Sequence, residues 1–146
     1  DDLGIAWHVL VDGDAAGERY AHMARHELRG RPEERRITRL PAPDIERFMW
    51  AAGYSNVFRR AAGDLKPKRQ RKHGRRGKRR GFKTQDVIRR AIRSVSKPGL
   101  ALRVAVAVAH AGGPGVPEVF RTMLDHTVNL ARESVSETPA QQADTA

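Results

Sequence analysis

The order of apolar and polar residues predicts a strand, a helix and a second strand at the start of the chain. Val9–Val11 is a short β-branched run, too short for a helix but long enough for a buried strand. A helix-periodic segment follows from Ala15 to Leu28, and Arg36–Leu40 then alternates polar and apolar residues as an edge strand does. Because a strand that leads into a helix through a tight turn is half of a βαβ unit, residues 1–43 predict an α/β core.

The apolar periodicity of residues 44–134 predicts a mostly α-helical lobe. A helix is expected from Asp44 to Gly53, whereas residues 54–62 form a connection without a clear pattern. Another helix is expected from Thr84, and the Val- and Ala-rich residues 101–110 favour a buried helix over a strand.

The last helix of the lobe is expected to open at Pro117 and to run to about Glu133. Its inward face is predicted to carry Val119, Phe120, Met123, Leu124, Val128 and Ala131. The polar residues 135–146 predict a disordered tail.

Composition narrows the class of protein. At 146 residues the chain has room for one domain, or one domain and a lobe, with a modest core. It contains no cysteine, which excludes a disulfide framework and a thiolate metal site, and no apolar run long enough to span a bilayer. Its first strand has no earlier strand with which to pair, so we expect a fragment of a larger protein.

The formal net charge of +11 is concentrated in one segment, because residues 66–83 hold eleven Lys or Arg and no Asp or Glu. The rest of the chain has 17 basic and 17 acidic residues. Such a segment is either a solvated linker, a localisation signal or an arm that binds phosphates. For the last reading the expected nucleic-acid-binding residues are Lys68, Arg69, Arg71, Lys72, Arg75, Arg76, Lys78, Arg79 and Arg80. With one aromatic residue in the segment, backbone recognition is expected rather than base recognition.

Two carboxylates follow the first predicted strand. Asp12 and Asp14 lie on either side of Gly13, at the end of a strand where ligands bind in open α/β sheets. Their hard oxygens suit Mg²⁺. The same residues also fit ordinary turn chemistry, in which Asp14 caps the helix that begins at Ala15.

Two further positions are candidates for chemistry. Lys97 stands at a predicted helix start, where the helix dipole disfavours a cation, although an exposed lysine there is also common. Glu46 lies in the first turn of the helix after the second strand, so it is either a third oxygen ligand or a solvated residue favoured by the dipole.

The pattern DxDxxG formed by Asp12, Asp14 and Gly17 behind an apolar strand resembles the second signature of the TOPRIM fold. Three segments in order, VDGDAAG (11–17), LPAPDIE (40–46) and SKPGLAL (96–102), resemble the C-terminal nuclease region of OLD-family ATP-dependent endonucleases. The resemblance covers most of residues 5–132. It implies the C-terminal part of a TOPRIM α/β core followed by a helical lobe.

The resemblance also implies a mechanism and partners. Asp12, Asp14 and Glu46 would be ligands of two divalent metal ions, Mg²⁺ or Mn²⁺, and Lys97 a catalytic lysine beside the scissile phosphate of DNA. An ABC-type ATPase would lie upstream in the same bacterial cytoplasmic protein, for which a homodimer is a candidate assembly. The TOPRIM glutamate of an earlier strand and the acidic residue just after it are absent from this sequence, so the fragment alone is expected to be inactive.

Two other classes of function stay open at this stage. One is another TOPRIM enzyme, a topoisomerase or primase; Tyr20 and Tyr54 are the only tyrosines available as a nucleophile, and neither has a supporting context. The other is a non-catalytic DNA-binding module of the recombination-mediator type.

Overall fold

The computed structural model describes residues 5–63, 83–110 and 114–136. The chain divides into two compact units: unit 1 is Asp1–Ile45 with Val116–Ala146, and unit 2 is Glu46–Gly115. The sequence predicted a core over 1–43 and a lobe over 44–134. The structure instead groups the last helix with the strands.

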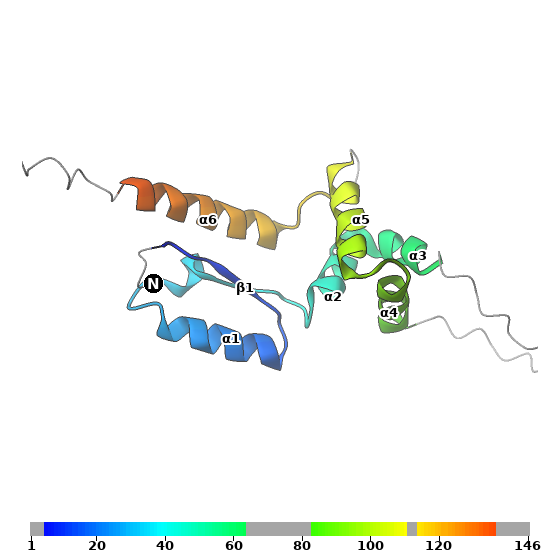
Figure 1. Ribbon diagram of the computed structural model, residues 1–146, viewed down its shortest axis with the longest axis horizontal. Helices are drawn as coiled ribbons and strands as arrows, with labels where there is room; N and C mark the ends of the chain where they lie inside the picture. Colours follow the sequence, from blue (N-terminus) through cyan, green and yellow to red (C-terminus); the bar gives the residue numbers. More distant parts are fainter. Residues whose placement is uncertain (1–4, 64–82, 111–113, 137–146) are drawn as a thin grey trace, which may run out of the picture. The chain divides into compact units, whose positions relative to one another are not determined.

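Unit 1 is a small α/β layer structure. Strands β1 (Val9–Val11) and β2 (Ile37–Arg39) pair in parallel, with Val9 opposite Ile37 and Val11 opposite Arg39. Helix α1 (Ala15–His26) and helix α6 (Glu118–Ser136) lie on opposite sides of the two strands (Figure 1). The predicted α/β class and both predicted strands are therefore confirmed.

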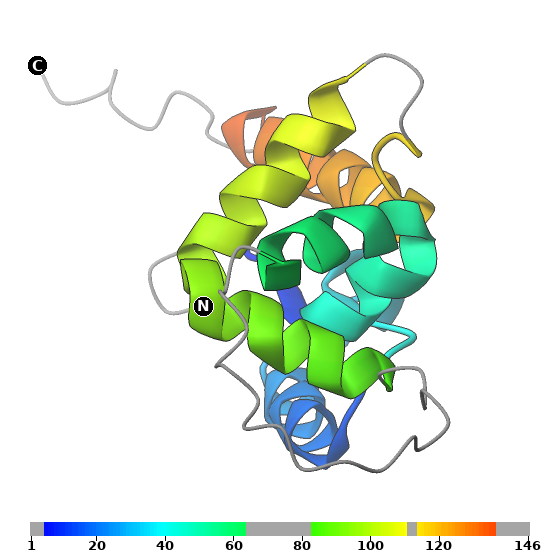
Figure 2. The ribbon, with the colours of Figure 1, turned by 90° about the vertical axis from the view of Figure 1, so that its right-hand side faces the viewer.

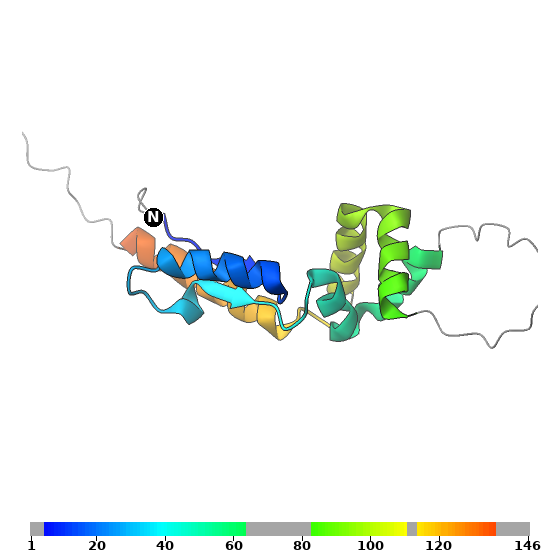
Figure 3. The same ribbon diagram turned by 90° about the horizontal axis from the view of Figure 1, so that it is seen from below.

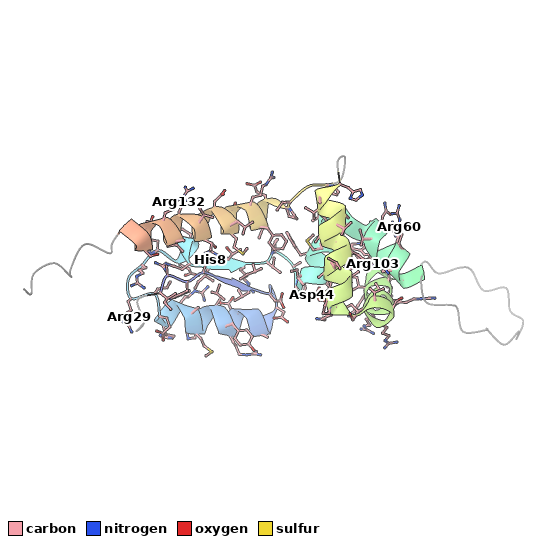
Figure 4. The ribbon with its side chains drawn as sticks, turned by 45° about the horizontal axis from the view of Figure 1, so that its top comes forward. His8, Arg29, Asp44, Arg60, Arg103 and Arg132 are labelled. Atoms are coloured by element: carbon pink, nitrogen blue, oxygen red, sulfur yellow. The ribbon has the colours of Figure 1, made fainter. Side chains whose placement is uncertain are left out.

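The two faces of this sheet carry different side chains, apolar on one face and polar on the other, because side chains alternate along a strand. Toward α1, a cluster of buried apolar side chains consists of Val11, Ala21, Leu28 and Ile37. Toward α6, the His8 ring bonds to the Thr38 hydroxyl (2.8 Å) and to the backbone oxygen of Arg35 (3.0 Å), and it lies 6.0 Å from the ring of His126. Figure 4 labels His8 on this side of the strands.

The two edges of the sheet are also covered differently. On the β2 side, ion pairs join α1 to β2 and to the 3₁₀ turn η1 (Glu33–Arg35), and η1 to α6: Glu18–Arg39, Arg25–Glu33 and Arg35–Glu133. The opposite flank of α1 exposes Tyr20 (63%) and Met23 (65%), and α6 exposes Leu124 (52%) and Val128 (46%). Ion pairs therefore link the elements around β2, while α1 and α6 each expose apolar side chains elsewhere on their surfaces. Figure 3 shows α1, α6 and the strands of this unit from below.

Unit 2 is helical throughout the part that the structure describes. Helix α2 (Ile45–Met49) leads into the π-type turn η2 (Trp50–Tyr54), in which Gly53 has φ 102° and breaks the helical path. Helix α3 (Ser55–Gly63) follows, and then α4 (Thr84–Val95) and α5 (Lys97–Ala109). Helices α3 and α4 lie side by side in Figure 2, with Phe58, Ala61 and Ala91 almost fully buried in this unit.

The expectation of a patternless connection over 54–62 was wrong. This stretch is α3, because Tyr54, Phe58, Ala61 and Ala62 recur at intervals of three to four residues and all four are buried. The apolar stripe is short and follows a glycine break, which hid its period in the sequence.

The burial expected for two other helices was wrong in part. Residues 101–110 are helical, as predicted, but α5 buries only Leu100 and Val104, and Leu102 is 66% exposed, because the helix packs on one side. In α6, Leu130 is the buried residue, while Leu124, Val128 and Ala131 are exposed. The helix therefore faces the sheet at a phase rotated from the expected one.

The expected basic segment and tail fall mostly outside the described residues, which leave out 64–82 and 137–146. No helix in the described ranges is long and apolar enough to cross a membrane.

The His8–His126 contact predicts a pH-dependent stability. Burial lowers the pKa of His8 below 6.5, and repulsion by His126 and Arg36 lowers it further, against the Arg35 carbonyl, which raises it. The unfolded chain therefore binds the proton more readily. The contribution of neutral His8 to the free energy of unfolding is therefore complete above pH 6.5. It is lost as the pH falls through the lower pKa that His8 has in the folded state.

We expect the urea concentration at the unfolding midpoint to decrease as the pH is lowered from 7.5 to 5. In a His8→Gln variant this midpoint should depend less on pH over the same range. The measurement is urea unfolding followed by circular dichroism at several pH values. An unchanged slope in the variant would show that other groups cause the pH dependence.

Candidate functional site

The turn after β1 is held in place by backbone contacts on two sides. The Gly13 N–H donates to the Ala42 carbonyl (2.9 Å), which ties this turn to the loop that follows β2. A Cβ atom on Gly13 would lie 2.5 Å from the carbonyl oxygens of Leu40 and Ala42. The two loops therefore approach so closely that only glycine fits between them.

Gly17 makes a second close backbone contact at the same turn, with Asp12. A Cβ atom there would lie 1.8 Å from the Asp12 carbonyl oxygen, so the first turn of α1 rests directly on the Asp12 backbone. This contact explains why the aspartates and the glycine occur at this spacing. It fixes where the Asp12 backbone lies relative to the start of α1.

Asp14 is the N-cap of α1, as one of the two readings of the sequence predicted. Its Oδ1 atom accepts from the backbone N–H groups of Ala16 (2.9 Å) and Gly17 (2.8 Å). Both bonds go to one oxygen, so capping makes no use of Oδ2 and is compatible with a ligand there. Asp12 is exposed at the end of β1.

Arg39, at the end of β2, also contacts this turn, which the sequence did not predict. Its guanidinium donates to the Gly13 carbonyl (3.2 Å) and to Glu18 Oε2 (2.5 Å). Hydrogen bonding from Arg25 and the charge of Arg39 hold the pKa of Glu18 below its usual value. The signal in the sequence was an arginine at the carboxyl end of the second strand, which the strand pattern explained only as a polar position.

The site residues of unit 2 form a pair of their own. Lys97 Nζ lies 3.2 Å from Glu46 Oε1, and the side chain of Glu46 is only 12% exposed while that of Lys97 is 69% exposed. Helix α5 begins at Lys97, as expected. The sequence named both residues, and the structure adds that the carboxylate of one holds the ammonium group of the other.

Ser96 sets the position of Lys97. It connects α4 to α5 with φ 64° and ψ 166°, a left-handed backbone that side chains disfavour, and its hydroxyl accepts from the Gly99 N–H (3.3 Å). Backbone strain of this kind persists only where surrounding structure enforces it, and it is concentrated at functional sites. The strained residue of this connection thus stands immediately before Lys97.

Other candidate residues are placed as follows. Tyr54 is 2% exposed and its hydroxyl donates to the Gly115 carbonyl, which gives it a structural role and leaves no accessible nucleophile at that position. Tyr20 is exposed on α1. The nine expected nucleic-acid-binding residues of the basic segment lie outside the described residues.

Asp12 and Asp14 are the residues of the β1 turn that could hold a divalent cation. Mg²⁺ keeps several waters and is commonly bound by one or two carboxylates together with substrate phosphates. Asp12 and Asp14 supply hard oxygens of this kind at a turn whose backbone is fixed. Among the residues that the structure describes, no group of three or more His, Cys, Asp or Glu is arranged to hold a metal ion.

The comparisons with known proteins give one relative. The chain is 39% identical over 134 residues to uncharacterized protein YbjD of Escherichia coli K12, a match that covers 89% of this chain and 22% of that protein. The chain thus spans about a fifth of its relative, whose name states no activity. No protein-family model matches the sequence, and no solved structure matches it.

The close approach of Gly17 to Asp12 predicts a sharp effect of substitution. We expect Gly17→Ala to destabilise the protein by about 1–3 kcal/mol, because the new methyl group must displace α1 from the Asp12 backbone. Gly63→Ala is the matched control. No atom lies within 4 Å of its added Cβ, so we expect it to be neutral or slightly stabilising.

Chemical unfolding of the two variants beside the parent chain measures the difference. Equal stabilities for Gly17→Ala and Gly63→Ala would contradict the contact described at the turn.

Proposed function

We propose that this chain is the nuclease part of a metal-dependent DNA endonuclease of the OLD type, built on a TOPRIM core. The observation that carries the proposal is the rigid Asp12–Gly13–Asp14 turn at the carboxyl end of a parallel strand, which presents two carboxylates on a fixed backbone. The order of the three sequence motifs and the Lys97–Glu46 pair support it.

In this proposal Asp12 and Asp14 hold divalent metal, Mg²⁺ or Mn²⁺, through their carboxylate oxygens. A metal held by these residues would supply Lewis-acid activation of water and charge neutralisation at the phosphate. Gly13, Gly17 and Arg39 contact the backbone of this turn, so little backbone reorganisation would be needed when substrate binds. The remaining acidic ligands would come from Glu46 and from the upstream glutamate that the resemblance implies.

Lys97 supplies the positive charge for the phosphate. Its ammonium group is mostly exposed, and Glu46 orients it through one ion pair. A cation held in position stabilises the negative charge that develops on the phosphoryl oxygens during hydrolysis. Glu46 is proposed to act both as this orienting group and as a ligand.

The relative's length is compatible with a larger assembly. Because the chain matches 22% of YbjD, most of that protein lies outside the matched region. We propose that an upstream ATPase and the first TOPRIM strand occupy the corresponding part of the natural protein. The alternative of a non-catalytic DNA-binding module stays open to the same experiment.

The first test is plasmid nicking by the full-length natural protein in Mg²⁺, Mn²⁺ and Ca²⁺. We expect Asp14→Asn to lower the nicking rate at least about a hundredfold, because the amide retains the N-cap but not the anionic oxygens. Asp125→Asn, on the exposed part of α6, is the control and should nick normally. Normal nicking by Asp14→Asn would show that Asp14 is only the N-cap of α1 and is not a metal ligand.

The second test concerns Lys97. We expect Lys97→Ala to reduce the rate of the chemical step about 10²–10³-fold while duplex affinity changes little, because the lost charge acts mainly in the transition state. Single-turnover cleavage and fluorescence anisotropy measure the two quantities. A loss of affinity that accounts for the whole effect would make Lys97 a binding residue and not a catalytic one.

A further inference from the structure

The two units carry opposite formal charge. Unit 2 contains 19 Lys and Arg against 3 Asp and Glu, a charge of +16, whereas unit 1 contains 9 against 14, a charge of −5. The excess in unit 2 does not come from residues 64–82 alone. Its described residues hold 9 Lys and Arg against Glu46 and Asp86, a charge of +7. The folded helices themselves are therefore strongly basic.

Much of this charge is gathered on one face. The buried side of α4 is formed by Ile88 and Ala91, so the helical period turns Arg89, Arg90 and Arg93 outward. Arg89 and Arg93 are exposed, and Arg90 is half-buried. Since Arg89 and Arg93 are four residues apart on one helix, their repulsion disfavours the free helix.

Neighbouring helices extend the basic face on both flanks of α4. On one flank, Gln85, with its amide oxygen turned inward, accepts from Arg89 Nη2 (3.0 Å) and from Arg47 Nη2 of α2 (2.9 Å). Two guanidinium groups thus converge on one neutral oxygen. On the other flank, Arg59 of α3 and Arg90 of α4 border a groove of about 390 Å³, which is also lined by Ala62, Gly63, Val87 and one acidic residue, Asp86.

We infer that this surface, the α4 basic face (Arg47, Arg59, Arg89, Arg90 and Arg93), binds the phosphodiester backbone of duplex DNA. The inference rests on the proposed function for the identity of the polymer, and it assigns substrate binding to folded helices in addition to the basic segment. Guanidinium groups suit phosphate because each presents several donors in a fixed plane.

The aromatic residues of unit 2 favour a duplex over a single strand. Phe48, Tyr54 and Phe58 are buried, and Trp50 packs edge-on against Phe58 with the Arg59 guanidinium 5.2 Å from its ring centre. In the described part of this unit the Phe and Tyr rings are therefore buried, and the partly exposed Trp50 ring is already in contact with Phe58 and Arg59. Stacking of an unpaired base on an open Phe, Tyr or Trp ring is the usual device of single-strand binding. Contacts to a duplex backbone need no such ring.

The experiment measures binding of the full chain to a 20-base-pair duplex by fluorescence anisotropy in EDTA, at several NaCl concentrations. In the triple variant Arg89→Gln, Arg90→Gln, Arg93→Gln we expect Kd to rise at least about tenfold near 0.1 M salt. The slope of log K against log salt should fall by about 2–3, because each phosphate contact contributes about 0.9.

The control removes the same charge from unit 1. Arg19→Gln, Arg29→Gln, Arg121→Gln changes three exposed residues of that unit, and we expect its salt slope to change by less than about one. Circular dichroism melting of both triple variants checks that they fold. Equal losses in the two variants would overturn the proposal, because net charge alone would then explain binding.

A second background separates the α4 basic face from the basic segment. With every Lys and Arg of residues 66–80 replaced by Gln, duplex binding should remain measurable and should vanish only when the α4 substitutions are added. No binding in the first of these proteins would overturn the proposal. The proposal would also be overturned if the protein bound phosphatidylserine vesicles, or a single strand of 20 nucleotides, more tightly than it binds the duplex.

This test is independent of cleavage, since EDTA removes divalent metal. If the natural protein shows no plasmid nicking in any of the three metals while the α4 variant loses duplex binding, the nuclease assignment fails and the binding surface stands. If instead Asp14→Asn loses nicking while the α4 variant binds the duplex as tightly as the parent protein, the nuclease assignment stands and this binding surface does not.

Discussion

The hydrogen bond from Gly13 N–H to the Ala42 carbonyl is the contact on which the first unit depends. It joins the loops that leave two parallel strands, and parallel strands of three residues each have few ladder bonds of their own. The approach of Gly17 to Asp12 then fixes α1 against the same loop. Two glycines therefore determine where the carboxylates of this turn stand.

Unit 2 follows a different rule, because its candidate chemistry depends on a strained connection and on charge. The left-handed backbone of Ser96 starts α5 at Lys97, and the nearly buried carboxylate of Glu46 holds the lysine. Around it the helices accumulate arginine with few acidic residues to compensate. Stability alone does not favour such a surface, whereas binding of a polyanion does.

The sequence predicted the features that local chemistry determines. The β-branched run Val9–Val11, the cap at Asp14 and the helix start at Lys97 are each specified by a few neighbouring residues, and the structure agrees. What depends on tertiary packing was not predictable. The phase of α6, the exposed side of α5 and the role of Arg39 all depend on which element each helix or strand meets, and a single sequence does not record that.

The exposed ion pairs and the exposed apolar side chains of unit 1 respond in opposite ways to salt. Exposed ion pairs such as Glu18–Arg39 weaken as ionic strength rises, whereas the burial of Tyr20, Met23, Leu124 and Val128 against any neighbour becomes more favourable in salting-out anions such as sulfate. Chloride and sulfate at equal ionic strength should therefore separate the two contributions.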